Sequence, residues 1–363
     1  MANADIVAYN IAVFIATLFV LEFGADKFIH HTAIVARRTG ISETLIGLLT
    51  AGGEWEELAV VAASLAQGRS SLAIGNVVGS AISNILGAFS LGLLFYEKGK
   101  PVQFDHSSRV YSILALVVTT FFAPAAYFHT RAVWLGCGSI LLASFVFYII
   151  SVAIGIRRGH LTAPEDSDSD SSDDDQVDVN SRVGDAERQS SSSDADLIQD
   201  RPEEARCRGR GLAYHIFYLF VGFLATCLAG YILSHAAITI TDEFGLSNIL
   251  FGVIILAIAT TLPEKFIAVI SGHRGHGGIL VANTAGSNIF LLTLCAGIIF
   301  VDAKDVDKGD VTVPELAVLW ASTLAFTLTV WFGERFARWI GALMVLLYIV
   351  FIVLDVLVIH SVV

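Results

Sequence analysis

The stretch TAGGEWEEL, residues 50–58, places three glutamates within four positions of an otherwise apolar segment. That segment runs from about residue 41 to residue 67 and has the length of a membrane-spanning helix. A carboxylate near the centre of a bilayer costs about 2.5–3.5 kcal/mol on insertion scales. Acids at that depth are therefore expected to serve a function, and their partners are expected elsewhere in the membrane-spanning sequence.

The composition of the chain is that of a polytopic membrane protein. Of its 363 residues, 55% are hydrophobic and only 15% are charged, whereas soluble domains are about 25% charged. We predict an all-α membrane protein with about ten transmembrane helices, arranged as two inverted five-helix repeats. The predicted helices are roughly 6–23, 41–67, 71–95, 108–128, 132–156, 212–234, 247–271, 277–300, 313–332 and 337–359.

A Ser- and Asp-rich segment separates the two predicted halves, residues 1–158 and 212–363. Residues 159–211 hold 15 acidic residues against six arginines and few large apolar side chains. Such a segment cannot bury a core, so we expect a disordered, solvated linker. Its acidic serine pattern is typical of kinase substrates, which makes a kinase a possible partner.

The distribution of lysine and arginine predicts the orientation of the chain. Outside the linker, eleven basic residues fall on the loops of one side and four on those of the other. The positive-inside rule then places the linker in the cytosol and both termini on the opposite side. We expect residence in the plasma membrane or in a vacuole-like organelle membrane.

The chain contains an internal repeat that involves these acids. The first copy is GGEWEELAVVAASLAQGRSSLAIGNVVGSAISNIL from Gly52, and the second is ATTLPEKFIAVISGHRGHGGILVANTAGSNIFLLT from Ala259. An offset of 207 residues, without gaps, aligns Glu57 with Glu264, Asn76 with Asn283, Gly79 with Gly286, and Ser80 with Ser287. An odd number of helices separates the counterparts, so the copies enter the membrane from opposite sides. Inverted repeats of this kind place ion sites near the midplane of many transporters.

Each copy carries a predicted helix break just before its glutamate. Gly52-Gly53 precedes the first, and residues 260–263, TTLP, precede the second. Carbonyl groups that such breaks set free are tolerated in a membrane only beside protein or a wet cavity. Together with carboxylates they form an all-oxygen ligand set, which suits hard cations such as Ca²⁺ and Na⁺.

Polar stripes on the second helix of each copy could complete a ligand shell opposite the glutamates. In the first copy, Gly75 and Gly79 beside the stripe predict close packing on a neighbouring helix. The stripes consist of Asn76, Ser80, Ser83 and Asn84 in the first copy, and of Asn283, Thr284, Ser287 and Asn288 in the second.

These motifs resemble the alpha repeats of the Ca²⁺:cation antiporter superfamily, which includes the Na⁺/Ca²⁺ exchangers. TTLPEK followed by NTAGSNIF is similar to the second repeat, and GGEWEEL followed by GNVVGSAISNIL to a diverged first repeat. The resemblance implies that helices 6–23 and 212–234 slide across the site to alternate access. It also implies that Glu57 and Glu264 ligate Ca²⁺, with further ligands at Ser80, Ser287, Thr260, Thr261 and Asn84.

The chain departs from the family pattern at several positions, including Gly53 in place of the threonine of a Thr-Ser pair and Ala81 in place of the asparagine of a GSN element. Glu54 stands where the first repeat of the family has the serine of a Thr-Ser pair, and Leu291 stands where exchangers commonly have an acid or amide. Lys265 replaces the usual leucine after the second glutamate. We infer that the site keeps three acids, Glu54, Glu57 and Glu264. Because close carboxylates repel one another, one of them should bind a proton readily, so H⁺ competes with Na⁺ as the counter-ion.

Structural explanations compete with some of these assignments. Ser80 and Ser287 could bond to their own helices, and cross-helix hydrogen bonds explain Asn76 and Asn283 equally well. A helical position about 100° from its neighbours leaves Glu56 outside the predicted ligand set. We expect Lys265 to snorkel or to pair with an acid.

The sequence thus predicts a secondary antiporter that exchanges Ca²⁺ for Na⁺ or H⁺. No enzyme activity, cofactor or nucleic-acid partner is expected, and the ions and the lipid bilayer are the expected partners. The alternatives are an intramembrane hydrolase, although HExxH and GxSxG motifs are absent, and a passive cation channel. The predicted ligands are Glu57, Glu264, Glu54, Ser80, Ser287, Asn84, Thr260, Thr261, Asn76 and Asn283.

Overall fold

The structure is a computed structural model that describes residues 4–38, 53–97, 102–128, 130–158, 212–302 and 311–359. Every regular element within these ranges is helical, as the sequence predicts. The helices are α1 (Ala4–Arg38), α3 (Trp55–Ala66), α4 (Ser70–Ile82), α5 (Ser90–Leu94), α6 (His106–Tyr127), α7 (Arg131–Arg157), α9 (Leu212–Phe244), α10 (Asn248–Leu250), α11 (Ala257–Thr260), α12 (Leu262–His273), α13 (Gly277–Phe290), α14 (Ala296–Asp302), α15 (Val313–Phe332) and α16 (Ala337–Leu354). The π-helical turns are η1 (Ser83–Phe89), η2 (Phe251–Leu256), η3 (Leu291–Cys295) and η4 (Asp355–Ile359).

The helices have the length and apolarity of a multi-pass integral membrane protein. Among the described residues, eight helices can cross a membrane, and a ninth span is formed by a pair bent by 49° between Thr260 and Leu262. The predicted spans 108–128, 132–156 and 313–332 agree with α6, α7 and α15 to within two residues. Most of the first half of the predicted span 41–67 and the predicted linker 159–211 lie outside the described residues.

Two predicted helices are much longer in the structure. The first continues past its predicted end at residue 23 to Arg38, and the sixth continues past residue 234 to Phe244. Helix α1 continues through Gly24, where the absence of a side chain lets α9 approach closely. A Cβ at Gly24 would lie 2.9 Å from the backbone nitrogen of Thr226. In α9, the apolar run after Ser234 continues the buried face of the helix.

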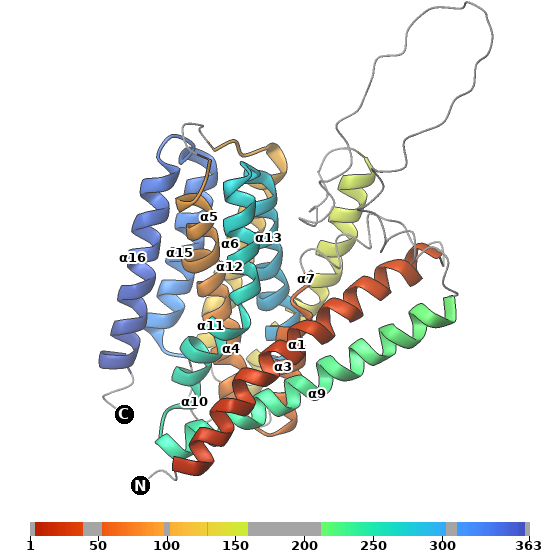
Figure 1. Cartoon of the computed structure of the whole chain (residues 1–363). Coiled ribbons are helices and arrows are strands. Elements are labelled where there is room, and N and C mark those ends of the chain that lie inside the picture. The colour runs from red at the N-terminus through yellow and green to blue at the C-terminus, as the bar shows by residue number, and fades with distance from the viewer. Residues whose placement is uncertain are drawn as a thin grey trace, which may run out of the picture.

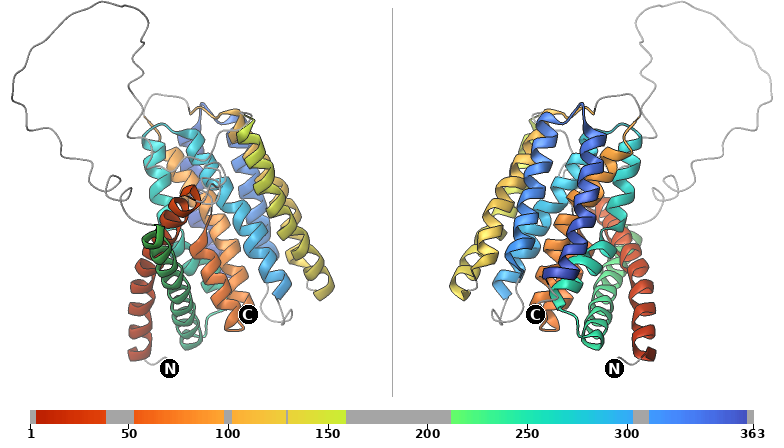
Figure 2. Two further views of the ribbon diagram at one scale, coloured as in Figure 1. Left: turned by 90° about the vertical axis from the view of Figure 1, so that its right-hand side faces the viewer. Right: turned by 90° about the vertical axis from the view of Figure 1, so that its left-hand side faces the viewer.

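Helices α1 and α9 form an antiparallel pair that runs diagonally beside the main bundle (Figures 1 and 2). Gly24 faces Thr226, and Phe28 faces Gly222, so the two helices run in opposite directions along their contact. Small residues at such contacts allow the backbones to approach closely. The pair is what an inverted repeat requires of its two counterpart helices.

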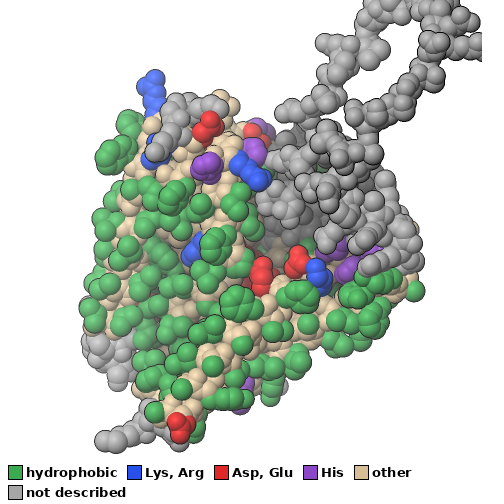
Figure 3. All heavy atoms as spheres, viewed as in Figure 1, with side chains coloured by type: hydrophobic (Ala, Val, Ile, Leu, Met, Phe, Trp, Pro, Cys, Tyr) green, Lys and Arg blue, Asp and Glu red, His purple; other side chains and the backbone are tan. Residues whose placement is uncertain are grey.

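Two separate groups of buried apolar side chains hold the helices together. The larger lies within the main bundle, among α4 to α7 and α12 to α16. The smaller joins α1 and α9 to the site helices through residues such as Phe14, Val60 and Phe251. On the outside, apolar side chains cover the flank of the bundle in Figure 3, as expected of a surface that faces lipid.

The two copies of the repeat interlock through glycines. A Cβ at Gly79 in α4 would overlap the carbonyl oxygen of Val253 in η2, and a Cβ at Gly272 in α12 would overlap the carbonyl oxygen of Gly92 in α5. Both contacts join the second span of the first copy, Ser70–Leu94, to the first span of the second copy, the bent pair Asn248–Thr260 and Leu262–His273. The close packing predicted for Gly79 is thus present, and it brings the two glutamate-bearing helix starts together.

Candidate ion-binding site

Two helices, α3 and α12, begin inside the bundle, and each carries an acidic residue in its first turn. In the first copy, Glu54 precedes α3 with φ −75° and ψ 69°, so its backbone is not helical. In the second copy, Thr261 separates α11 from α12 with φ −91° and ψ 18°, and Pro263 occupies the first turn. This break is at the position that the sequence predicts. Helix starts favour negative charge, because their unpaired N–H groups carry partial positive charge.

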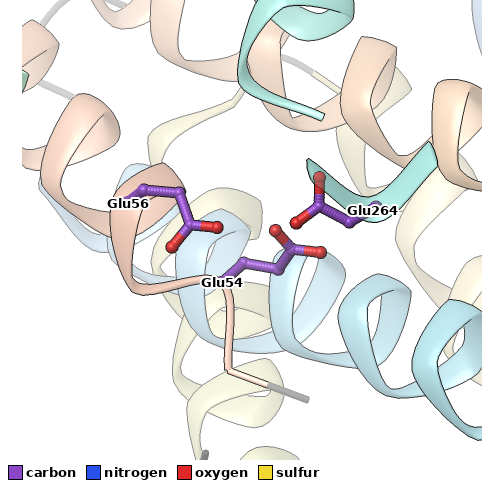
Figure 4. A group of neighbouring side chains, drawn as sticks. All are labelled: Glu54, Glu56 and Glu264. Carbon is purple, nitrogen blue, oxygen red and sulfur yellow. The ribbon is translucent and has the colours of Figure 1, made fainter. Parts of the chain in front are cut away.

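Three carboxylates converge at these helix starts. Glu54, Glu56 and Glu264 each offer one oxygen, and these oxygens lie within 4.8 Å of one another; Figure 4 shows the three side chains pointing to one space. Their exposed fractions are 3%, 8% and 7%. The Oε2 atoms of Glu54 and Glu264 have no hydrogen-bond partner among the described residues. The cluster therefore has oxygens available for a ligand.

Glu56 belongs to this cluster, although the sequence-based hypothesis left it out. That hypothesis assumed that Glu54 and Glu56 lie on one continuous helix, about 100° per residue apart. Because Glu54 is the non-helical residue before α3, its side chain can point toward Glu264, into the space that Glu56 also faces. The acidic sequence EWEE was the available signal, but the helix start had to be placed to the residue to interpret it.

Glu57 lies beside the cluster and is held by neutral donors. Its Oε1 atom accepts hydrogen bonds from Ser80 Oγ at 2.7 Å and from Thr260 Oγ1 at 2.6 Å, and its Oε2 atom accepts one from Asn76 Nδ2. Ser80 and Asn76 come from its own repeat, whereas Thr260 comes from the other. Glu57 is therefore not part of the group formed by Glu264 with Glu54 and Glu56.

The other predicted residues divide between these two groups and their surroundings. Asn84 Nδ2 lies 3.4 Å from Glu54 Oε1, and Ser287 also interacts with Glu54. Asn84 further contacts Asn288 Oδ1 at 3.3 Å, and so links the two repeats. Asn283 is half-buried on α13, and within the described residues no hydrogen bond joins it to the carboxylates.

Lys265 does not snorkel to the membrane surface. Its Nζ atom donates to Ser83 Oγ at 2.9 Å, to the Thr261 carbonyl oxygen at 3.0 Å and to Thr261 Oγ1 at 2.5 Å. Tyr348 on α16 also donates to Ser83 Oγ, at 3.0 Å. Sequence reasoning placed Ser83 on a polar stripe but could not connect it with Lys265, because that contact depends on how the two repeats pack.

The arrangement suits a hard cation. Four carboxylates, from Glu54, Glu56, Glu57 and Glu264, are buried close together, with Lys265 as a nearby cation. Like charges repel strongly in such a low-dielectric interior, and carboxylate, hydroxyl and amide oxygens are the ligands that Ca²⁺ and Na⁺ prefer. A divalent ion between these side chains would offset much of the repulsion.

Comparison with known proteins gives relatives over almost the whole chain. The sequence model of the family "Sodium/calcium exchanger protein" matches residues 9–154 and 214–357. The sodium/calcium exchanger MaX1 of Methanosarcina acetivorans is 25% identical over 354 residues, which cover 96% of this chain and 98% of that protein. A protein of Alkalimonas amylolytica named "Putative antiporter CaxA" is 27% identical, with coverage of 86% and 89%.

Solved structures share the fold. The sodium-calcium exchanger NCX_Mj superposes with a TM-score of 0.55 at 21% identity, over 95% of this chain and 98% of that one. The structure of native YfkE superposes with a TM-score of 0.65 at 15% identity, over 95% and 91%. The family match covers residues on both sides of the segment 155–213, and the fold agrees with it. The chain belongs to the sodium/calcium exchanger protein family.

Proposed function

We propose that this protein is a secondary antiporter that exchanges Ca²⁺ for a monovalent cation, Na⁺ or H⁺, by alternating access. The Ca²⁺ ion binds where Glu54, Glu56 and Glu264 converge, and Glu57 completes the site from the side of Ser80 and Thr260. Hydroxyl and amide oxygens of Ser287, Asn84 and Asn76 supply or orient further ligands. We keep Thr261 and Asn283 in the proposal as residues that surround the ligands and do not themselves contact the ion.

The convergence of Glu54, Glu56 and Glu264 carries the proposal. These acids come from two helix starts that lie about 200 residues apart in the sequence, and their nearest oxygens lie within 4.8 Å of one another. Burial of several carboxylates without a counter-charge is costly. Bringing them together from both repeats is favourable only if a cation occupies the space between them.

The same electrostatics couple the two ions. When Ca²⁺ leaves, the buried carboxylates lose their compensating charge, and the site cannot close across a low-dielectric interior without replacing it. Monovalent cations or protons restore the balance, and their binding to the same carboxylates excludes Ca²⁺. Exchange follows because one anionic cluster cannot hold both kinds of ion at once.

The pair α1 and α9 is the proposed moving part. The two helices bury their contact with each other, and they touch the rest of the molecule chiefly through α3, where Gly230 lies against Ala59 and Ser64 contacts Ser234 at 2.9 Å. Their apolar cluster also includes Val60, Leu72 and Phe251 of the site helices, but it is separate from the larger cluster of the main bundle. Two helices that pack mainly on each other and have one principal contact with the rest can slide across the site as a unit.

Uptake of radiolabelled Ca²⁺ into proteoliposomes tests the proposal. We expect uptake that requires an opposing gradient, imposed separately with Na⁺ or with pH. Uptake without any opposing gradient would identify a channel. Absence of uptake under both gradients, by protein shown to be folded, would contradict the proposal.

Two substitutions connect the flux with the site. Glu57→Gln and Glu264→Gln each remove one buried charge while preserving the shape of the side chain, and each is expected to abolish uptake. Glu334→Gln is the matched control, because Glu334 lies half-exposed beside Arg109, 3.4 Å away, outside the site. Wild-type flux in either site variant would remove the assignment.

A further inference from the structure

Lys265 occupies a cradle of neutral oxygens that both repeats supply. Its Nζ atom contacts Ser83 Oγ from the first repeat, and the hydroxyl and carbonyl oxygens of Thr261 from the second, at 2.5–3.0 Å. An ammonium group has three protons to donate, and the cradle provides three acceptor oxygens. Its position is thus specified from both repeats.

The cradle has its own supporting contacts. Ser83 Oγ lies 2.9 Å from Thr261 Oγ1, and Tyr348 donates to it at 3.0 Å. The carbonyl oxygen in the cradle belongs to Thr261, the residue at the helix break. The preceding residue, Thr260, donates a hydrogen bond to Glu57. It therefore adjoins the carboxylates, and Lys265 interacts electrostatically with Glu264, Glu54 and Glu57.

Hydroxyl and carbonyl oxygens at a helix break are a typical ligand set for a monovalent metal cation such as Na⁺. None of these oxygens belongs to a carboxylate, so the cradle oxygens offer no acidic group that could take up a transported proton. An ammonium group has the same charge as Na⁺ and makes the same kind of contact with oxygen. The difference is that Lys265 is tethered and cannot leave.

We propose that the Lys265 ammonium group is a built-in monovalent cation that fills a position where a transported metal cation would otherwise bind. The inference rests on the proposed exchange function and specifies its stoichiometry. Each cycle moves one fewer monovalent metal cation per Ca²⁺ than it would if the cradle were open to Na⁺. Lys265 is thus a residue that determines coupling, held apart from the divalent ion.

Lys265→Met is the informative variant. The methionine side chain is unbranched and reaches about as far as the lysine Cε atom, so it removes the charged nitrogen and leaves the cradle oxygens in place. Lys265→Arg keeps the positive charge and serves as the conservative variant. Lys27→Met removes a charge from a half-exposed lysine on α1 that pairs with Asp26, away from the cradle.

The measurement is made in proteoliposomes with equal pH on both sides and the membrane potential clamped at zero. For each Na⁺ gradient, it determines the ratio of Ca²⁺ concentrations inside and outside at which the net Ca²⁺ flux stops. This Ca²⁺ ratio equals the Na⁺ ratio raised to the number of Na⁺ ions exchanged per Ca²⁺, and that exponent should be larger by one in Lys265→Met than in the wild type. An about tenfold Na⁺ gradient should then support a Ca²⁺ ratio about tenfold higher in the variant. Lys265→Arg and Lys27→Met should keep the wild-type dependence.

The same dependence in Lys265→Met and the wild type would overturn the inference and leave Lys265 as a structural anchor. A wild type without any coupled exchange would instead contradict the proposed function. If Lys265→Met carries no flux, the melting temperature of the purified variants decides. Na⁺, compared with choline at equal ionic strength, should raise the melting temperature of Lys265→Met more than that of the wild type, and equal responses would refute the inference.

Discussion

The two copies of the repeat have matched backbones and unmatched charges. The first copy begins its site helix with three acids, Glu54, Glu56 and Glu57, whereas the second begins with one acid and one base, Glu264 and Lys265. Both helices start inside the bundle, and the 207-residue offset aligns their first residues, Trp55 and Leu262. The scaffold is therefore symmetric while the chemistry is not.

This difference shows which features each copy must keep. Because the copies enter the membrane in opposite directions, matched helix starts are needed to bring their acids together. The total charge around the ion is a property of both copies combined, so acids and bases can be distributed unequally. The first copy supplies three of the four buried acids, and the second supplies the acid Glu264 and the base Lys265.

The largest effect is expected from the second copy, which has a single acid. Glu264→Gln leaves no carboxylate on that side of the space shared with Glu54 and Glu56. Because Ca²⁺ affinity depends on the charge count of its ligands, we expect uptake to fall by about 100-fold or more. Glu54→Gln should cost less, since Glu56 still converges with Glu264. A larger loss in Glu54→Gln, measured by initial uptake rates, would reverse the comparison.

The next effect concerns the shared scaffold. Gly79→Ala and Gly272→Ala each place a methyl group against a carbonyl oxygen of the other copy, and each should lower the free energy of unfolding by about 1–3 kcal/mol. Gly136→Ala is the control, because its Cβ would meet no atom within 4 Å. Thermal unfolding in detergent measures all three. A stable Gly79→Ala variant beside a destabilised Gly272→Ala variant would show that the two contacts are not equivalent.

A smaller effect separates Glu56 from a structural role. Glu56→Gln removes one of three charges from the convergent group, so Ca²⁺ affinity should fall by about tenfold, or about 1.4 kcal/mol. Equilibrium binding of radiolabelled Ca²⁺ to the purified protein measures it. Glu334→Gln, half-exposed beside Arg109 and outside the site, is the control with no expected change. Unchanged affinity in Glu56→Gln would restore the original three-acid set of Glu54, Glu57 and Glu264.

The smallest effect concerns how Glu57 is held. Ser80→Ala removes one of three hydrogen bonds to its carboxylate, and Thr260→Ala removes another. A hydrogen bond to a charged group contributes about 1.5–3 kcal/mol, but two donors remain and Glu57 can reorient. We therefore expect the Michaelis constant for Ca²⁺ to rise by about three- to tenfold in each variant. Equal rises would show that the two repeats hold Glu57 equally.

The fold was accessible from the sequence where apolarity and turn residues act locally. The predicted span 313–332 coincides with α15, which begins at a Thr312 capping box and ends at Gly333. The predicted end at residue 23 was wrong, because α1 continues through Gly24 to Arg38 along its contact with α9, and that contact depends on the packing of two distant segments.

The candidate site was accessible in part for a similar reason. Matched spacing identified Glu57 and Glu264, since the repeat preserves the positions of both. The place of Glu56 depends on the non-helical backbone at Glu54, and that of Lys265 depends on Ser83 in the other repeat. Neither is encoded in the periodicity of a single helix.

The position of the bound ion tests the central claim most directly. Crystals of the protein grown with Ca²⁺, with the ion located by anomalous scattering, should show one site inside the bundle. We predict oxygens of Glu54 and Glu264 within about 2.3–2.6 Å of that ion, so that both repeats contact it. An ion held by carboxylates of one repeat alone, with the other acid turned to separate surroundings, would contradict the account.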